Sequence, residues 1–122
     1  MPHARQQLGQ AGEAAAVSYL EGLGYEILAQ NWHAGRYGEI DIVAQDGVAL
    51  VVIEVKARQS IGFGYPEEAV NKTKQDKLRS AAQAYVLAHP QLPAELRFDV
   101  VAVVLTPGGE VMELKHYRGA ME

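Results

Sequence analysis

Residues 38–56, GEIDIVAQDGVALVVIEVK, contain two strongly apolar runs on either side of an Asp-Gly pair. Both runs are rich in valine and isoleucine, which favour strands, and Asp46-Gly47 suits a tight two-residue turn. The stretch therefore predicts a β-hairpin with strands over Glu39–Gln45 and Val48–Lys56. This hairpin decides the fold because its register determines which charged side chains lie together.

The predicted hairpin has one apolar face and one face that is charged at its open end. With Asp46-Gly47 at the centre of the turn, Glu39 lies opposite Glu54 and Asp41 lies opposite Val52. Because alternate residues of a strand share a face, each face can be listed. The apolar face holds Ile40, Ile42, Ala44, Ala49, Val51, Ile53 and Val55, and the other holds Glu39, Asp41, Val43, Leu50, Val52, Glu54 and Lys56.

Asp41, Glu54 and Lys56 form a combination that suits metal-assisted phosphate chemistry. As diagonal neighbours, the two acids are about 7–8 Å apart at the backbone. Mg²⁺ is commonly held by one or two carboxylates together with water and substrate phosphate. The Lys56 ammonium can position a water or stabilise charge on a phosphate. The alternative is a solvated, charged hairpin end, and an odd-length turn would put the acids on opposite faces.

The rest of the chain predicts one α/β domain over residues 1–122, with a core from about 8 to 117. The expected order, α-β-β-β-α-β-β, indicates a mixed sheet flanked by helices. The strands on either side of the second helix are expected to be parallel, because a helical crossover joins them. The segments outside the hairpin are Arg5–Gly24 (helix), Tyr25–Asn31 (strand), Trp32–Gly38 (loop), a glycine-containing loop at 62–66, Ala69–His89 (helix), Arg97–Leu105 (strand) and Val111–Tyr117 (strand).

Composition and charge narrow the class of protein. The chain has 122 residues, 48% of them hydrophobic, no cysteine and a net charge of −4. The absence of cysteine excludes a disulfide scaffold and a thiolate zinc site. We find no signal peptide and no run of about 18 apolar residues, so a cytoplasmic location is expected. The negative charge argues against a protein that coats nucleic acid by charge alone, although an acidic cation site contributes to the same count.

Glu13 is a third candidate carboxylate. In a helix it falls on the stripe of Ala16, Val17 and Leu20. A carboxylate on an inward stripe is costly unless it is paired or coordinating. The alternative is a glutamate at the edge of the stripe, favoured near a helix start by the helix dipole.

These motifs resemble those of a known superfamily. Residues 38–43 (GEIDIV) and 53–56 (IEVK) resemble the D…ExK signature of the restriction-endonuclease-like, or PD-(D/E)xK, superfamily, although Ile40 stands where many members have proline. With GQAGEAA at 9–15 and RFDVV at 97–101, the chain is similar over about residues 8–117 to the YraN-type family. That family consists of small bacterial proteins that resemble archaeal Holliday junction resolvases.

The resemblance implies a fold and an activity. It implies a restriction-endonuclease-like fold in which Asp41, Glu54 and Glu13 bind Mg²⁺ or Mn²⁺ and Lys56 is catalytic. The expected activity is hydrolysis of DNA phosphodiester bonds, with branched or structured DNA as a candidate substrate. A homodimer would supply the two active sites that cutting both strands requires. The alternatives are a nucleic-acid-binding or assembly module with little catalytic activity, and a plain structural or partner-binding protein.

Further polar residues lie near the predicted site, and each has two interpretations. Basic side chains could contact phosphates, although a lysine-rich helix surface is also ordinary solvation. Lys74 is distinguished because it shares the inward stripe of Leu78. Glu39 is either an accessory ligand or a solvated neighbour, and Asp99 is either a structural hydrogen-bond acceptor or a neighbour of the site. The candidates for nucleic-acid contact are Arg36, Arg58 and Lys74, with Tyr37 as a candidate for base stacking.

Overall fold

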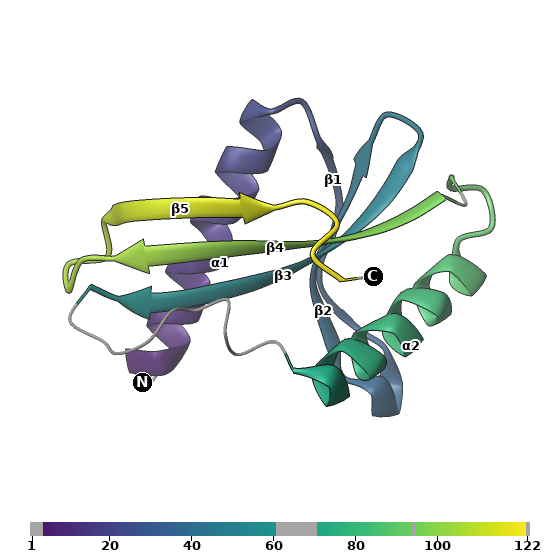
Figure 1. Ribbon diagram of the computed structural model, residues 1–122, viewed down its shortest axis with the longest axis horizontal. Helices are drawn as coiled ribbons and strands as arrows, with labels where there is room; N and C mark the ends of the chain where they lie inside the picture. The colour runs from purple at the N-terminus through teal and green to yellow at the C-terminus, as the bar shows by residue number, and fades with distance from the viewer. Residues whose placement is uncertain (1–3, 61–70, 94, 122) are drawn as a thin grey trace.

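A five-stranded mixed sheet forms the centre of the molecule, with one helix packed on each face (Figure 1). The computed structural model describes residues 4–60, 71–93 and 95–121, with side chains from residue 7. The elements are α1 (Ala4–Gly22), β1 (Glu26–His33), the 3₁₀ helix η1 (Gly35–Tyr37), β2 (Glu39–Asp46), β3 (Ala49–Gln59), α2 (Lys72–Ala88), β4 (Glu95–Leu105) and β5 (Val111–Tyr117). The loop predicted at 62–66 and the first two residues of the predicted second helix lie outside the described residues.

The strands lie side by side in the order of the chain, β1-β2-β3-β4-β5. β3 and β4 run parallel and are linked through α2, whereas the other neighbouring pairs are antiparallel. This confirms the parallel pair expected from the helical crossover. β3 is the middle strand, so its first six residues are buried by layers above and below the sheet.

Two apolar clusters, one on each face, hold the helices against the sheet. In Figure 1, α1 passes behind β3, β4 and β5, and α2 lies over the other face next to β2. The α1 cluster joins Ala16 and Leu20 to Ile42, Ala44, Ala49, Val51, Ile53, Val101, Val103 and Leu105. The α2 cluster joins Leu78, Ala81, Ala82 and Tyr85 to Ile40, Val43, Leu50 and Val52. The apolar stripe predicted for the second helix is thereby confirmed.

The hairpin turns one residue later than the sequence predicted. Asp46 pairs with Ala49, so the loop consists of Gly47 and Val48 instead of Asp46 and Gly47. Gly47 has a φ of 60°, in the left-handed region that glycine adopts without a steric penalty. Val48 is 72% exposed, as expected for the tip of a turn.

The later turn shifts the register of β2 against β3 by two residues. Val52 pairs with Val43, so the predicted pairing of Val52 with Asp41 is wrong, and so is that of Glu39 with Glu54. An even shift keeps the alternation of the two faces. Ile40 is the exception, because β2 has separated from β3 at that point and Ile40 packs in the α2 cluster.

Gly12 allows α1 to approach the sheet closely. A Cβ atom at Gly12 would lie 2.5 Å from the Cβ atom of Ala57 in β3, which is shorter than any real contact. A side chain at position 12 would push the helix away from the strand. The approach therefore fixes the distance between β3 and Glu13, the next residue of α1.

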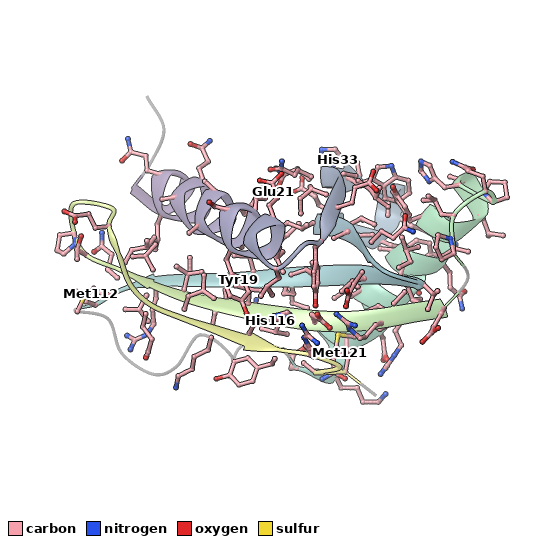
Figure 2. All side chains as sticks on the ribbon, turned by 90° about the horizontal axis from the view of Figure 1, so that it is seen from above. Tyr19, Glu21, His33, Met112, His116 and Met121 are labelled. Atoms are coloured by element: carbon pink, nitrogen blue, oxygen red, sulfur yellow. The ribbon has the colours of Figure 1, made fainter. Side chains whose placement is uncertain are left out.

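A buried polar network ties α1 to β4 and to β5. Asp99 is fully buried and accepts hydrogen bonds from the Arg97 guanidinium, the Gly119 N–H and the His116 ring. The other ring nitrogen of His116 lies 3.1 Å from the Tyr19 hydroxyl, and both residues are labelled in Figure 2. Asp99 is thus a structural hydrogen-bond acceptor, which is one of the two roles that the sequence left open for it.

Trp32 belongs to β1 and not to the predicted loop, because it pairs with Ile40 of β2. Its indole also packs against Tyr85 of α2, with ring centroids 5.0 Å apart.

Within the described part of the chain, no helix has both the length and the apolar character needed to cross a membrane.

Candidate active site

Asp41, Glu54 and Lys56 come together where β2 separates from β3. The paired ladder ends at Ile42 and Ile53. Beyond it, the N–H of Val55 donates to Asp41 Oδ2 at 2.9 Å. A side-chain carboxylate therefore takes a hydrogen bond that a backbone carbonyl would otherwise accept. This leaves a cavity of about 510 Å³, lined by Leu8, Gly9, Glu13, Asp41, Glu54, Val55, Lys56, Ala57 and Lys74.

Glu54 is the most deeply buried acid of the cavity, at 5% exposure. Its Oε1 atom contacts Lys74 Nζ at 2.8 Å and Lys56 Nζ at 3.3 Å. A buried carboxylate is costly unless it is paired, and here two ammonium groups supply the pairing. Lys74 reaches Glu54 from the first turn of α2, whose N-cap Asn71 accepts the Lys74 N–H.

Asp41 lies in an environment that opposes its ionisation. Burial, followed by the charges of Glu54 and Glu13, raises the pKa of Asp41 to about 7, and the hydrogen bond from Val55 only partly offsets these effects. The pKa of Glu13 is also raised, chiefly by burial, although a hydrogen bond from Asn31 opposes the shift. A cation among these acids would restore their ionised forms.

The two lysines of the cavity differ in their electrostatic environments. Burial and the neighbouring Lys74 lower the pKa of Lys56, and the Glu54 carboxylate only partly opposes this. Burial also disfavours the charge of Lys74, but the hydrogen bond and charge of Glu54 outweigh it and raise its pKa. Lys74 is therefore the main counter-ion of Glu54. Lys56 is the lysine whose charged form is less stabilised.

The carboxylates of this cavity are oxygen donors of the kind that a hard divalent cation takes. In the described residues, no group of three or more acids and histidines is close enough to form a complete metal cage. Mg²⁺ does not require one, because one or two carboxylates usually suffice when water and phosphate complete the shell. Asp41 and Glu54 supply that number. Burial and then the repulsion from Glu54 raise the pKa of Asp41, and a cation would relieve the repulsion.

Most of the residues predicted for the site share this cavity. Glu13, Asp41, Glu54, Lys56 and Lys74 all line it. Arg36 and Arg58 do not. The Arg36 guanidinium lies 5.2 Å from the ring centroid of Tyr37 in the exposed η1 segment. The Nε and Nη1 atoms of Arg58 are buried and have no hydrogen-bond partner within the described residues.

Glu39 and Asn31 do not line this cavity but lie near its residues. Glu39 lies 3.4 Å from His33 Nε2 at the edge of the sheet. Asn31 was not predicted as a site residue, yet it has a φ of 52° and its side chain hydrogen-bonds to Glu13. Asparagine tolerates the left-handed region better than most residues, but many asparagines at strand ends do not adopt it, so the sequence signal is weak.

The fold and this cavity define a mixed α/β domain in which a buried glutamate lies among partly buried acids and lysines, at the point where two strands separate. The chain belongs to UPF0102, described as an uncharacterised protein family, whose model matches residues 12–103. This is the YraN-like family that the motifs indicated. The matched residues include every residue proposed for the site.

Relatives resemble the chain over most of its length, and each is described as a UPF0102 protein. The one from Acetivibrio thermocellus is 43% identical over 111 residues, which is 91% of this chain and 85% of the relative. The one from Caldicellulosiruptor saccharolyticus is 40% identical over 116 residues, covering 95% and 98% respectively. The one from Mycolicibacterium vanbaalenii is 44% identical over 115 residues, covering 94% and 93%.

Proposed function

We propose that this protein is a Mg²⁺- or Mn²⁺-dependent endonuclease that hydrolyses phosphodiester bonds of DNA, with branched or structured DNA as its substrate class. One observation carries the proposal: Asp41, Glu54 and Lys56 line a single cavity where β2 and β3 separate. Glu13 of α1 lines the same cavity. An exposed hairpin end would not bury Glu54 between two lysines.

We also propose that the fold is restriction-endonuclease-like. Three features support this: the parallel β3–β4 pair linked through α2, the position of α1 on the opposite face, and the D…ExK residues at the separating strands. In this arrangement the sheet holds the acids rigidly, while the two helices supply Glu13 and Lys74 from opposite sides.

In the proposed mechanism, Asp41 and Glu54 would hold the cation, with Glu13 as a further carboxylate. When bound, the cation would neutralise phosphate charge and lower the pKa of water. Lys56 would orient the attacking water or donate to a phosphate oxygen as negative charge develops. Its lowered pKa makes Lys56 a readier proton donor than an ordinary lysine.

Basic residues around the cavity would position the DNA backbone. Lys74 is 43% exposed in its side chain, so it could contact a phosphate while it remains near Glu54. Arg58 lies two residues beyond Lys56 on β3, so it would add positive charge on the same side of the strand. Arg36 lies further out on η1, where it would contact the backbone beyond the cleaved bond.

The first test is cleavage of labelled DNA by the purified protein. Cleavage should require Mg²⁺ or Mn²⁺, should stop with chelator, and should be abolished by Asp41→Ala. The branched substrate should be cut faster than a linear duplex of the same sequence. Equal activity of the Asp41→Ala variant would point to a contaminating nuclease and would overturn the proposal.

A nucleic-acid-binding module with little catalytic activity is the second candidate, and one observation favours it. Lys74 and Lys56 already neutralise Glu54 through ion pairs, so the acid has partners without a metal. The two candidates differ in calorimetry with Mn²⁺. The nuclease should bind Mn²⁺ and lose this binding in Asp41→Ala, whereas the module should bind DNA with an affinity that chelator does not change.

A further inference from the structure

A second cavity, of about 450 Å³, adjoins the candidate active site. It is lined by Tyr37, Gly38, Glu39, Glu54, Asn71, Thr73, Lys74, Lys77 and Leu78. Glu54 and Lys74 line both cavities, so their ion pair separates the two spaces. If a DNA strand placed one phosphate beside Glu54 in the first cavity, its neighbouring nucleotide would lie in the second cavity.

The α2 side of this second cavity has the chemistry of an anion site. Lys74 and Lys77 are three residues apart on α2, so they lie on the same side of the helix. Thr73 belongs to the first turn, where backbone N–H groups and the helix dipole favour negative charge. Leu78, at 4% exposure, supplies an apolar floor. Glu39 is an opposing charge, but it is also close to His33.

The opposite side of the cavity presents an aromatic ring. Tyr37 is the last residue of η1, which is followed by Gly38 with a φ of 87°. The Arg36 guanidinium lies 5.2 Å from the ring centroid, and its Nη2 donates to the Tyr37 hydroxyl at 3.1 Å. Tyr37 also packs in part against the α2 cluster, and its ring remains partly exposed where it lines the cavity. Ring faces of this kind stack on nucleobases whatever their sequence.

We propose that the second cavity binds an unpaired nucleotide next to the phosphate that is cleaved, with its base against Tyr37 and its phosphate near Lys77 and Thr73. This inference rests on the proposed function and specifies its substrate. A base within an intact duplex is stacked and paired, so it would reach Tyr37 only after leaving the helix. The preferred DNA is therefore single-stranded next to the cut, as in a flap or an open branch point.

Binding measured in chelator tests the inference without relying on cleavage. The probes are a fluorescently labelled single strand and a blunt duplex of the same sequence, followed by anisotropy. Tyr37→Ala should weaken binding of the single strand by about tenfold, the loss expected from one base–aromatic stack. Binding of the blunt duplex should stay unchanged. Tyr37→Phe keeps the ring and loses only the hydroxyl that accepts from Arg36, so it should retain most of the single-strand affinity. Unchanged duplex binding by Tyr37→Ala is the check on its folding.

Lys77→Ala should weaken single-strand binding and lower its salt dependence by about one charge. Lys72→Ala is the matched control, because Lys72 is an exposed lysine of the same helix that pairs with Asp76 and lies outside both cavities. Equal losses from Lys72→Ala and Lys77→Ala would indicate a general effect of surface charge and would overturn the inference. Equal losses on single strand and duplex would overturn it too, as would wild-type protein that does not bind the single strand.

These outcomes are distinguishable from failure of the nuclease proposal. If Asp41→Ala abolishes cleavage but Tyr37→Ala binds the single strand normally, only the nucleotide cavity is wrong. If no cleavage occurs with any metal but Tyr37→Ala selectively weakens single-strand binding, the cavity stands and the protein is a binding module.

Discussion

Asn31 is the only residue other than glycine in the described part of the chain with a positive φ, 52°. A left-handed conformation costs an L-residue about 1–2 kcal/mol, somewhat less for asparagine. The residue lies in β1 between the pairs that join Gln30 to Ile42 and Trp32 to Ile40, so it is next to the start of the candidate site. Its side chain hydrogen-bonds to Glu13. A strained residue that contacts a candidate ligand indicates a positioning role.

Asn31→Gly tests separately the backbone strain at position 31 and the side-chain interaction with Glu13. Glycine adopts the same φ freely, so the free energy of unfolding should stay constant or rise by up to about 1 kcal/mol. Loss of the hydrogen bond to Glu13 should weaken Mn²⁺ binding by about tenfold, as is typical when a residue that orients a ligand is removed. Thermal unfolding and Mn²⁺ calorimetry measure the two effects. A variant that loses stability and keeps its Mn²⁺ affinity would show that Asn31 has only a structural role.

At the scale of elements, α1 closely approaches β3 at Gly12 and Ala57. Because a Cβ atom at Gly12 would come within 2.5 Å of the Ala57 Cβ, Gly12→Ala should force α1 outwards. We expect it to destabilise the protein by about 1–3 kcal/mol, the usual cost of overpacking. Chemical denaturation measures this change. Mn²⁺ affinity should fall as well, since Glu13 moves with the helix.

Gly9 provides the matched control for Gly12. A Cβ atom at Gly9 meets nothing within 4 Å, so Gly9→Ala should stabilise α1 by up to about 1 kcal/mol through helix propensity. In the double variant Gly12→Ala/Ala57→Gly, the removed methyl group should restore part of the lost stability. If Gly12→Ala is as stable as Gly9→Ala, the close approach does not hold the helix in place.

The sequence was sufficient to predict most elements, because their signals are local. The apolar stripe through Leu78 and Tyr85 specified the buried face of α2, and the crossover implied parallel β3 and β4. The hairpin register was wrong by two residues for a physical reason. Asp46-Gly47 and Gly47-Val48 can each form a two-residue turn around the same glycine, and the two turns give both strands the same pattern of faces.

The parts of the candidate site that follow strand alternation could be predicted from the sequence. The parts whose positions depend on tertiary contacts could not. Glu54 and Lys56 are two residues apart on β3, so their proximity followed from the pattern. The predicted diagonal arrangement of Asp41 and Glu54 depended on the register and is replaced by the contact of Asp41 with Val55. The backbone of Asn31 and the second cavity between η1 and α2 depend on how distant segments pack, which one sequence does not encode locally.

At the scale of the whole molecule, two aspartates on the central sheet, the buried Asp99 and the partly buried Asp41, respond to pH in opposite ways. Burial would raise the pKa of Asp99, but hydrogen bonds from Arg97, Gly119 and His116 hold it below its usual range. Its contribution to stability is present above about pH 4 and is lost as the pH falls further. The pKa of Asp41 is raised from 3.8 to about 7, so the folded state binds this proton more tightly. The stability that comes from Asp41 is full below about pH 4 and is lost as the pH rises towards 7.

The metal-free protein should therefore be most stable at mildly acidic pH, and Asp41→Asn should change that profile. Asparagine can still accept the Val55 N–H but cannot ionise. In chelator, the variant and the wild type should have similar unfolding free energies near pH 4. At pH 8 the variant should be more stable by on the order of 2 kcal/mol, below the roughly 4 kcal/mol that the full shift would imply, because solvent and Lys74 screen the charge. Urea unfolding across this pH range measures the difference. Added Mn²⁺ should stabilise the wild type at pH 8 and leave the stability of Asp41→Asn largely unchanged. If the two proteins have parallel profiles of unfolding free energy against pH in chelator, the raised pKa of Asp41 is contradicted.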